Sequence, residues 1–111
     1  MRKSTTQVVL VLVTTSSRKE AMTIAEALVK EKQAACVNIL PSVTSIFRWQ
    51  KKVQRNREKL MLIKTTRRRY PALEKAIRSL HSYEVPEIIS IRIDRGLPQY
   101  IDWVERETTV Y

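Results

Sequence analysis

The sequence has very little of three residue types on which many functional sites depend: one cysteine, one histidine and one glycine among 111 residues. The single Cys36 excludes a disulfide within the chain and a closed zinc site of paired cysteines. It is typical of a reducing compartment, so we expect a cytoplasmic protein. The single His81 excludes a two-histidine metal site within one chain. The single Gly96 excludes a glycine-rich phosphate loop, so nucleotide hydrolysis is not expected.

Long apolar runs are absent as well. The longest, Val8–Val13, has six residues, whereas a helix that spans a bilayer needs roughly 20. No cleavage pattern of small residues follows this run, so we expect no targeting signal. The sequence therefore predicts neither a membrane-spanning segment nor a membrane partner.

Positive charge is what the sequence has in excess. Its 21 Lys and Arg residues against 11 Asp and Glu give a net charge of +10. The basic residues gather at 48–59 and 67–69, which suits a solvated surface or salt-sensitive phosphate binding. The paired aromatic residues of RNA-binding sheets are missing, so we expect no specific nucleic-acid partner. A positive field also repels free divalent cations, so local ligands must hold any bound metal.

The length and the 43% hydrophobic content predict one folded domain, residues 1–111. The β-branched run Val8–Val13 predicts a central strand that is covered on both faces. Ser17 and Glu20 have the spacing of a capping box, which predicts the start of a helix. Apolar residues then recur at helical intervals and predict its buried stripe: Ala21, Ile24, Ala25, Leu28 and Val29.

A hairpin without glycine is predicted next. Its first strand covers residues 34–40 and 44–49 with an interruption at Pro41, and its second strand covers Leu60–Thr65. A helix follows with Pro71 in its first turn and an end near His81. The apolar side of this helix is expected to contain Tyr70, Leu73, Ile77 and Leu80.

The last part of the chain predicts one more strand and one more helix. Ile89, Ile91 and Ile93 alternate with polar residues, which predicts a strand with one apolar face. Pro98 then opens a short terminal helix. The order of elements predicts an α+β fold, a ferredoxin-like βαββαβ sandwich with an additional C-terminal helix.

Five separated segments carry a resemblance to a known family: Ala34–Ile39, Ser45–Trp49, Ile63–Thr66, His81–Ile88 and Tyr100–Trp103. In this order and spacing they resemble the CutA divalent-cation-tolerance proteins over nearly the whole chain. The resemblance implies a compact homotrimer whose long hairpins pair between subunits. It also implies a role in tolerance of divalent metals, for which copper binding is the usual attribution.

The chain departs from the family pattern at several positions. The hairpin tip reads Gln50-Lys51-Lys52, where the family usually has an acidic residue and a glycine, and Ser82 replaces the usual proline. Some members are assigned copper through a cysteine at the end of the first strand and two adjacent histidines. Here Val13 and Leu80 occupy two of those three positions. Only His81 carries over from that ligand set.

The candidate metal ligands are His81, Cys36 and Glu87, with Glu84 nearby in sequence. Imidazole and thiolate both suit copper, and three copies of one residue could converge in a trimer. The structural alternative for His81 is a helix-end residue, for Cys36 a buried strand position, and for the carboxylates a solvated surface. The structural alternative is favoured for His81 and for Cys36.

The sequence assigns no catalytic residue and no cofactor needed for folding. We therefore expect a protein that is not an enzyme. The family resemblance implies a homotrimer implicated in copper or divalent-metal tolerance, with weak copper binding. The alternative is a PII-like trimeric sensor that recognises a small molecule in a cleft between subunits. The larger aromatic residues in the matched segments suit either assembly or such a cleft: Phe47, Trp49, Tyr83, Tyr100 and Trp103.

Overall fold

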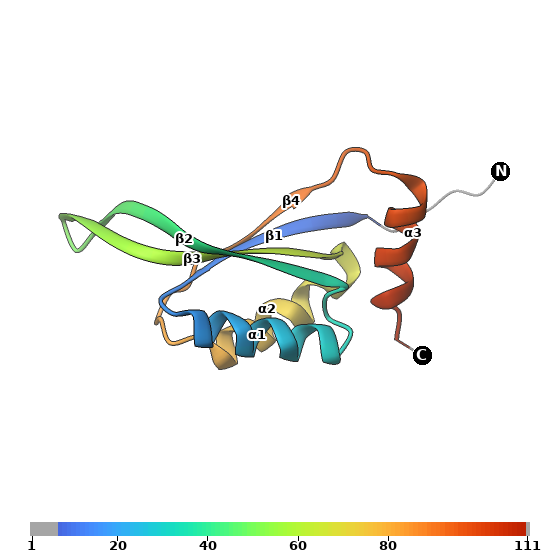
Figure 1. Ribbon diagram of the computed structural model, residues 1–111, viewed down its shortest axis with the longest axis horizontal. Coiled ribbons are helices and arrows are strands. Elements are labelled where there is room, and N and C mark those ends of the chain that lie inside the picture. Colours follow the sequence, from blue (N-terminus) through green and yellow to red (C-terminus); the bar gives the residue numbers. More distant parts are fainter. Residues whose placement is uncertain (1–6, 111) are drawn as a thin grey trace.

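A computed structural model describes residues 7–110 and shows one four-stranded sheet with three α-helices (Figure 1). The helices α1 and α2 lie side by side on one face of the sheet, and α3 lies at one end of the molecule. The elements are β1 (Val8–Thr15), α1 (Arg18–Lys30), β2 (Cys36–Trp49), β3 (Lys52–Thr66), a 3₁₀ turn (Arg67–Arg69), α2 (Tyr70–Leu80), β4 (Ile88–Arg92) and α3 (Pro98–Glu107). This confirms the predicted α+β class and the order of the elements.

The strand order is β2-β3-β1-β4, and every neighbouring pair is antiparallel. Side chains on a strand alternate between the two faces of the sheet. Val9, Val11 and Val13 of β1 therefore point to the same side and are buried. They pack in one core against the helical residues Ile24, Leu28, Leu73 and Ile77.

The face of the sheet opposite α1 and α2 is only partly covered. Leu10 and Leu12 on β1 are half-buried, and their β4 partners Ile91 and Ile89 are 48% and 49% exposed. Among residues 7–110, contacts close only one end of this face, where Val8 packs in a small cluster with residues of α3. The prediction that β1 is covered on both faces therefore holds for one face alone within a single chain.

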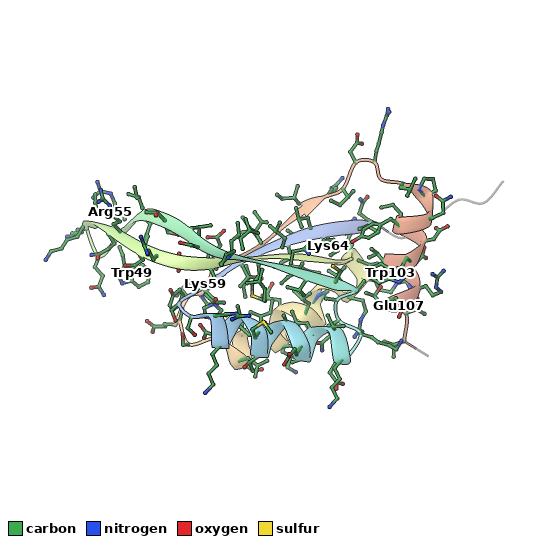
Figure 2. All side chains as sticks on the ribbon, in the orientation of Figure 1. Trp49, Arg55, Lys59, Lys64, Trp103 and Glu107 are labelled. Carbon is green, nitrogen blue, oxygen red and sulfur yellow. The ribbon has the colours of Figure 1, made fainter. Side chains whose placement is uncertain are left out.

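The β2–β3 hairpin is longer than predicted and extends beyond the rest of the molecule, as Figures 1 and 2 show. β2 continues through Pro41 because the strand absorbs the interruption as a register shift between Leu40 and Val43. The turn at the tip has positive φ angles at Gln50 (51°) and Lys51 (68°). Glycine is normally favoured at positions with such angles. The predicted hairpin without glycine is confirmed, and two residues other than glycine adopt the left-handed region at its tip.

Two helix predictions need correction. Ser17 does cap α1, because its hydroxyl accepts a hydrogen bond from the Glu20 N–H at 3.1 Å. The Glu20 carboxylate does not return the bond as a capping box would, since it binds the backbone N–H of Ser82 instead. Leu80 and Val29 are 41% and 43% exposed, because each lies at the end of its helix, beyond the core.

The sequence predicts no membrane-spanning segment, and the helices of the structure bear on this prediction. Within residues 7–110, no helix is both long enough and apolar enough to cross a bilayer.

Candidate functional site

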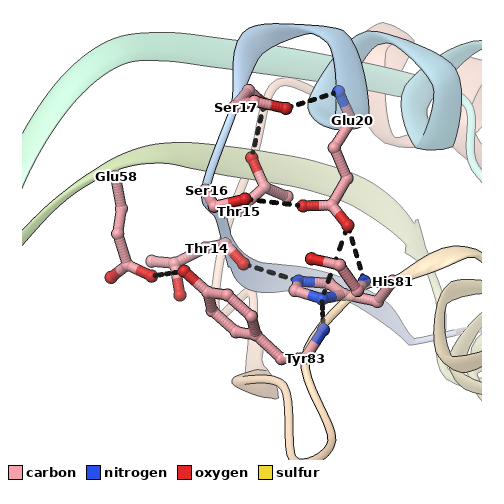
Figure 3. A network of polar contacts seen from close by, with 9 residues as sticks. Thr14, Thr15, Ser16, Ser17, Glu20, Glu58, His81 and Tyr83 are labelled. Carbon is pink, nitrogen blue, oxygen red and sulfur yellow. Dashed lines mark hydrogen bonds and ion pairs between the residues drawn. The ribbon is translucent and has the colours of Figure 1, made fainter.

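The polar network around His81 lies where α2 ends and the following loop returns to the sheet (Figure 3). The His81 side chain is fully buried. Its Nε2 lies 2.7 Å from the Thr14 carbonyl oxygen, and its Nδ1 lies 3.1 Å from the Tyr83 N–H nitrogen. A carbonyl only accepts and an N–H only donates, so these partners assign the neutral tautomer with its proton on Nε2. Both ring nitrogens are engaged by backbone groups.

Glu20 reaches the same loop from the first turn of α1. Its Oε2 accepts a hydrogen bond from the Ser82 N–H at 2.6 Å and lies 3.9 Å from His81 Nδ1. Burial alone would raise the pKa of this carboxyl, but hydrogen bonds from Ser82 and Ser16 outweigh burial and lower the pKa from its ordinary value of 4.5. Glu20 therefore fastens the loop after α2 to the start of α1.

Tyr83 connects this network to the hairpin. Its hydroxyl donates to Oε2 of Glu58 at 2.7 Å, and its ring lies 4.8 Å from the His81 ring, centroid to centroid. Glu58 is only 5% exposed. Burial and the neighbouring carboxylate raise the pKa of Tyr83 to about 12, because both disfavour a second negative charge. The hydroxyl thus stays protonated and keeps the loop attached to β3.

A groove of about 700 Å³ opens between the hairpin and this loop. Phe47 and Trp49 line it from β2, Glu58 lines it from β3, and Glu84 and Glu87 line it from the loop. Both loop carboxylates are exposed. The arrangement combines aromatic surface with negative charge in one concave site, which suits ligand binding.

Cys36 lies away from this site. It begins β2 opposite Lys64, whose partner on β1 is Leu10, whereas His81 contacts Thr14 on β1. Four residues along β1 correspond to about 13 Å. The Cys36 thiol is half-buried and lies beside Tyr100 of α3, whose pKa is raised by burial and by this thiol.

The structure does not bring the three predicted metal ligands together. His81 is closed off in the network, Glu87 lines the groove, and Cys36 lies elsewhere on the sheet. Within the described part of the chain, no group of three or more His, Cys, Asp or Glu side chains is placed to hold a metal ion. As ligands of a metal, these residues stay a prediction.

Sequence reasoning missed two acidic residues of the site. Glu20 was recognised only as a capping residue, because its contact with the Ser82 N–H joins residues that are 62 positions apart in the chain. Glu58 gave no signal, because a carboxylate between Arg57 and Lys59 in a charged hairpin looks like a solvated residue. Its burial follows only from contacts that are distant in sequence, such as the one with Tyr83.

Comparison with known proteins agrees with this fold. A family model described as "CutA1 divalent ion tolerance protein" matches residues 9–107. The divalent-cation tolerance protein CutA of Thermus thermophilus is 48% identical over 98 residues, which cover 88% of this chain and 95% of that protein. The mouse protein CutA is 44% identical over 86% of this chain, but the match spans only 54% of that longer protein.

Solved structures give the same result. The divalent cation tolerance protein of Thermus thermophilus superimposes with a TM-score of 0.90 at 46% identity, covering 92% of this chain and 99% of the other. A protein from Archaeoglobus fulgidus, described as a periplasmic divalent cation tolerance protein CutA, superimposes with a TM-score of 0.89 at 33% identity, covering 92% of this chain and 99% of the other. These matches give no support to a PII-like sensor. The chain belongs to the CutA divalent ion tolerance family.

Proposed function

We propose that this chain works in the cytoplasm as a homotrimer that contributes to tolerance of divalent metal ions, catalyses no reaction and binds copper weakly. The proposal includes a ferredoxin-like topology, which the strand order β2-β3-β1-β4 supports. Family membership supports the metal role. The cytoplasmic location rests on the single free thiol of Cys36, which suits a reducing compartment.

The homotrimer is proposed because one apolar face of the sheet is largely uncovered. Ile89, Ile91 and Leu40 are 49%, 48% and 38% exposed on this face, and half-buried leucines lie between them. Contiguous apolar surface of this kind is typical of a subunit interface. Covering it with further copies would remove these side chains from water, at about 25 cal/mol per Å² of apolar area.

The oligomeric state can be tested with one substitution and a matched control. We expect the parent chain to elute with the mass of a trimer in size-exclusion chromatography with light scattering. Ile91→Lys should shift the protein to smaller species, because it places a charge in the interface. Val29→Lys, at the C-terminal end of α1 and at similar exposure (43%), should leave the trimer intact. A monomeric parent chain would refute the assembly.

The buried network supports a role without catalysis. His81 is the one imidazole of the chain, and both of its nitrogens are held by backbone groups. A general base needs a free ring nitrogen that can reach a substrate. Copper binding at His81 likewise requires that the ring first leave the Tyr83 N–H, which explains why we propose weak binding.

Copper titration followed by calorimetry tests the metal proposal. Cys36 offers a half-exposed thiol that suits Cu(I), and Glu87 offers an exposed carboxylate. We expect Cys36→Ala, His81→Ala or Glu87→Gln to weaken binding of copper relative to the parent chain. Equal binding by all four proteins would remove these residues from the site, and no heat with the parent would refute direct copper binding.

A further inference from the structure

Glu58 is a buried carboxylate that has no cationic partner in its own chain. It is 5% exposed, and its hydrogen bond comes from the neutral Tyr83 hydroxyl at 2.7 Å. Among residues 7–110, no lysine, arginine or histidine forms an ion pair with Glu58. Its neighbours Arg57 and Lys59 point to the other side of β3, because side chains alternate along a strand. A buried charge without an opposite charge is costly, so we expect a cation from outside the chain at Glu58.

Lys64 is the complementary case on the same strand. It is half-buried, and its ammonium group donates to the side chain of Asn38 and to the Leu62 carbonyl, which are both neutral acceptors. In the part of the chain that the structure describes, no carboxylate forms an ion pair with Lys64. An ammonium group has three N–H donors, so these two contacts leave one donor for a further partner.

Both charges lie on the face of the sheet that the proposed trimer covers. Glu58 and Lys64 alternate along β3 with the core residues Met61 and Ile63, so they point away from α1 and α2. The strand residues between them on this face, and the residues paired with these across the sheet, carry no other charge. Six residues along a strand correspond to about 20 Å, so Glu58 and Lys64 cannot pair within one chain.

The symmetry of a trimer makes a pair between copies possible. In a ring with three-fold symmetry, each contact joins different surfaces of the two copies, whereas a two-fold dimer joins the same surface twice. Figure 2 labels Lys59, which is next to Glu58, toward the hairpin, and Lys64 closer to α3. Where the hairpin end of one copy contacts its neighbour, it therefore meets a different part of that copy, and Lys64 is the unpaired cation on the covered face.

We propose that Glu58 of one copy forms an ion pair with Lys64 of the neighbouring copy at each contact of the trimer. The inference rests on the proposed homotrimer and adds the residues that orient its copies. The pair balances both charges when the face is covered, and the Tyr83 hydroxyl holds the carboxylate in position. An apolar face alone allows several arrangements of two copies, whereas one pair of opposite charges fixes the register.

A double-mutant cycle on the assembly equilibrium tests this pair. Glu58→Gln and Lys64→Gln each remove one charge and keep a polar side chain. Sedimentation velocity over a dilution series, at a fixed urea concentration below the unfolding transition, gives the concentration at which half of the chains are assembled. We expect each single substitution to raise this concentration by about tenfold, because each leaves an unpaired charge in the interface. The combined variant should raise it by much less than the product of the two single effects.

The distance within one chain makes the cycle specific. Sites more than about 10 Å apart usually act additively, so coupling between Glu58 and Lys64 reports a contact between copies. Lys59→Gln is the matched control, because it removes a positive charge from the adjacent residue on the other face of β3, and it should combine additively with Glu58→Gln. If Glu58→Gln weakens the fold through Tyr83, the charge swap Glu58→Lys with Lys64→Glu in one chain decides, since it should assemble better than either of its single substitutions.

Three results would overturn the inference, and they separate it from the proposed trimer. A parent chain that stays monomeric at every concentration would refute the trimer and the pair together. An assembled parent in which Glu58→Gln and Lys64→Gln combine additively, and in which the charge swap restores no assembly, would refute the pair alone. Coupling of Lys59→Gln to Glu58→Gln as strong as that of Lys64→Gln would assign the effect to the net charge of the chain.

Discussion

Tyr83→Phe is a direct test of the network that holds the loop after α2 to the hairpin. The substitution keeps the ring and removes the hydroxyl that donates to Glu58 at 2.7 Å. Hydrogen bonds to charged groups contribute about 1.5–3 kcal/mol when their partner cannot be replaced by water. Glu58 is 5% exposed, but Tyr83 is only half-buried, so we expect the lower limit. The free energy of unfolding should fall by about 1.5 kcal/mol.

Urea unfolding at one fixed protein concentration measures this loss, because the stability of an oligomer depends on concentration. The matched variant is Glu58→Gln, which keeps an acceptor and removes the charge. A double-mutant cycle with both substitutions isolates the pair from effects of each residue on its other neighbours. We expect a coupling free energy of about 1 kcal/mol between Tyr83 and Glu58.

Additive effects of the two substitutions would refute the reasoning. A coupling below about 0.3 kcal/mol lies within the usual error of additivity. It would mean that water satisfies Glu58 without Tyr83, and that the loop is held by the contacts of His81 and Glu20. A change in the slope of unfolding with urea would instead indicate a less compact native or denatured state.

Three further predictions concern the turn of the hairpin and the dependence of the free energy of unfolding on pH, at acid pH and at alkaline pH. Lys51→Gly should raise the free energy of unfolding by about 0.5 kcal/mol in urea, because Lys51 has φ 68° and glycine adopts this region without strain; a loss of stability would contradict this. Glu20 has a lowered pKa, so its stabilising contribution is present above pH 4.5 and is lost as the pH falls through the folded-state pKa. Acid unfolding of Glu20→Gln should accordingly be less steep below pH 4.5, and identical pH profiles would exclude this role. Burial and neighbouring carboxylates raise the pKa values of Tyr70 and Tyr83 to about 12, so their contributions are complete below pH 10.0 and are lost as the pH rises through about 12. Absorbance of tyrosinate at alkaline pH should show one late-titrating group fewer in Tyr83→Phe, and an unchanged titration would assign the late group to another tyrosine.

The helices and the core strands followed from local pattern. Alternating valines in β1 and the spacing of Ile24 and Leu28 in α1 identify buried faces, because burial repeats with the period of each element. The length of the hairpin was not predictable in the same way. Its outer part is polar and carries many charges, so its strands are held by backbone pairing and not by an apolar pattern.

The candidate site was likewise predictable only in part from the sequence. The sequence identified His81 as the end of a helix and as the one residue carried over from the family's copper ligands. The structure decided that both of its nitrogens bind backbone groups, since Thr14 lies 67 residues away in the chain. It also decided that Glu58 is buried, although its neighbours in sequence are basic.

The sequence by itself determined the α+β class, the order of the elements and the resemblance to the CutA family, because these rest on local periodicity and on motifs that can be matched in one dimension. Only the tertiary structure decided which face of the sheet stays uncovered, how Tyr83 and Glu58 are joined, and that a groove with negative charge lies within a strongly basic chain. Those features depend on the pairing of β2 with β3 and on the return of the loop after α2. Both bring together residues whose distance in the sequence carries no information about their distance in space.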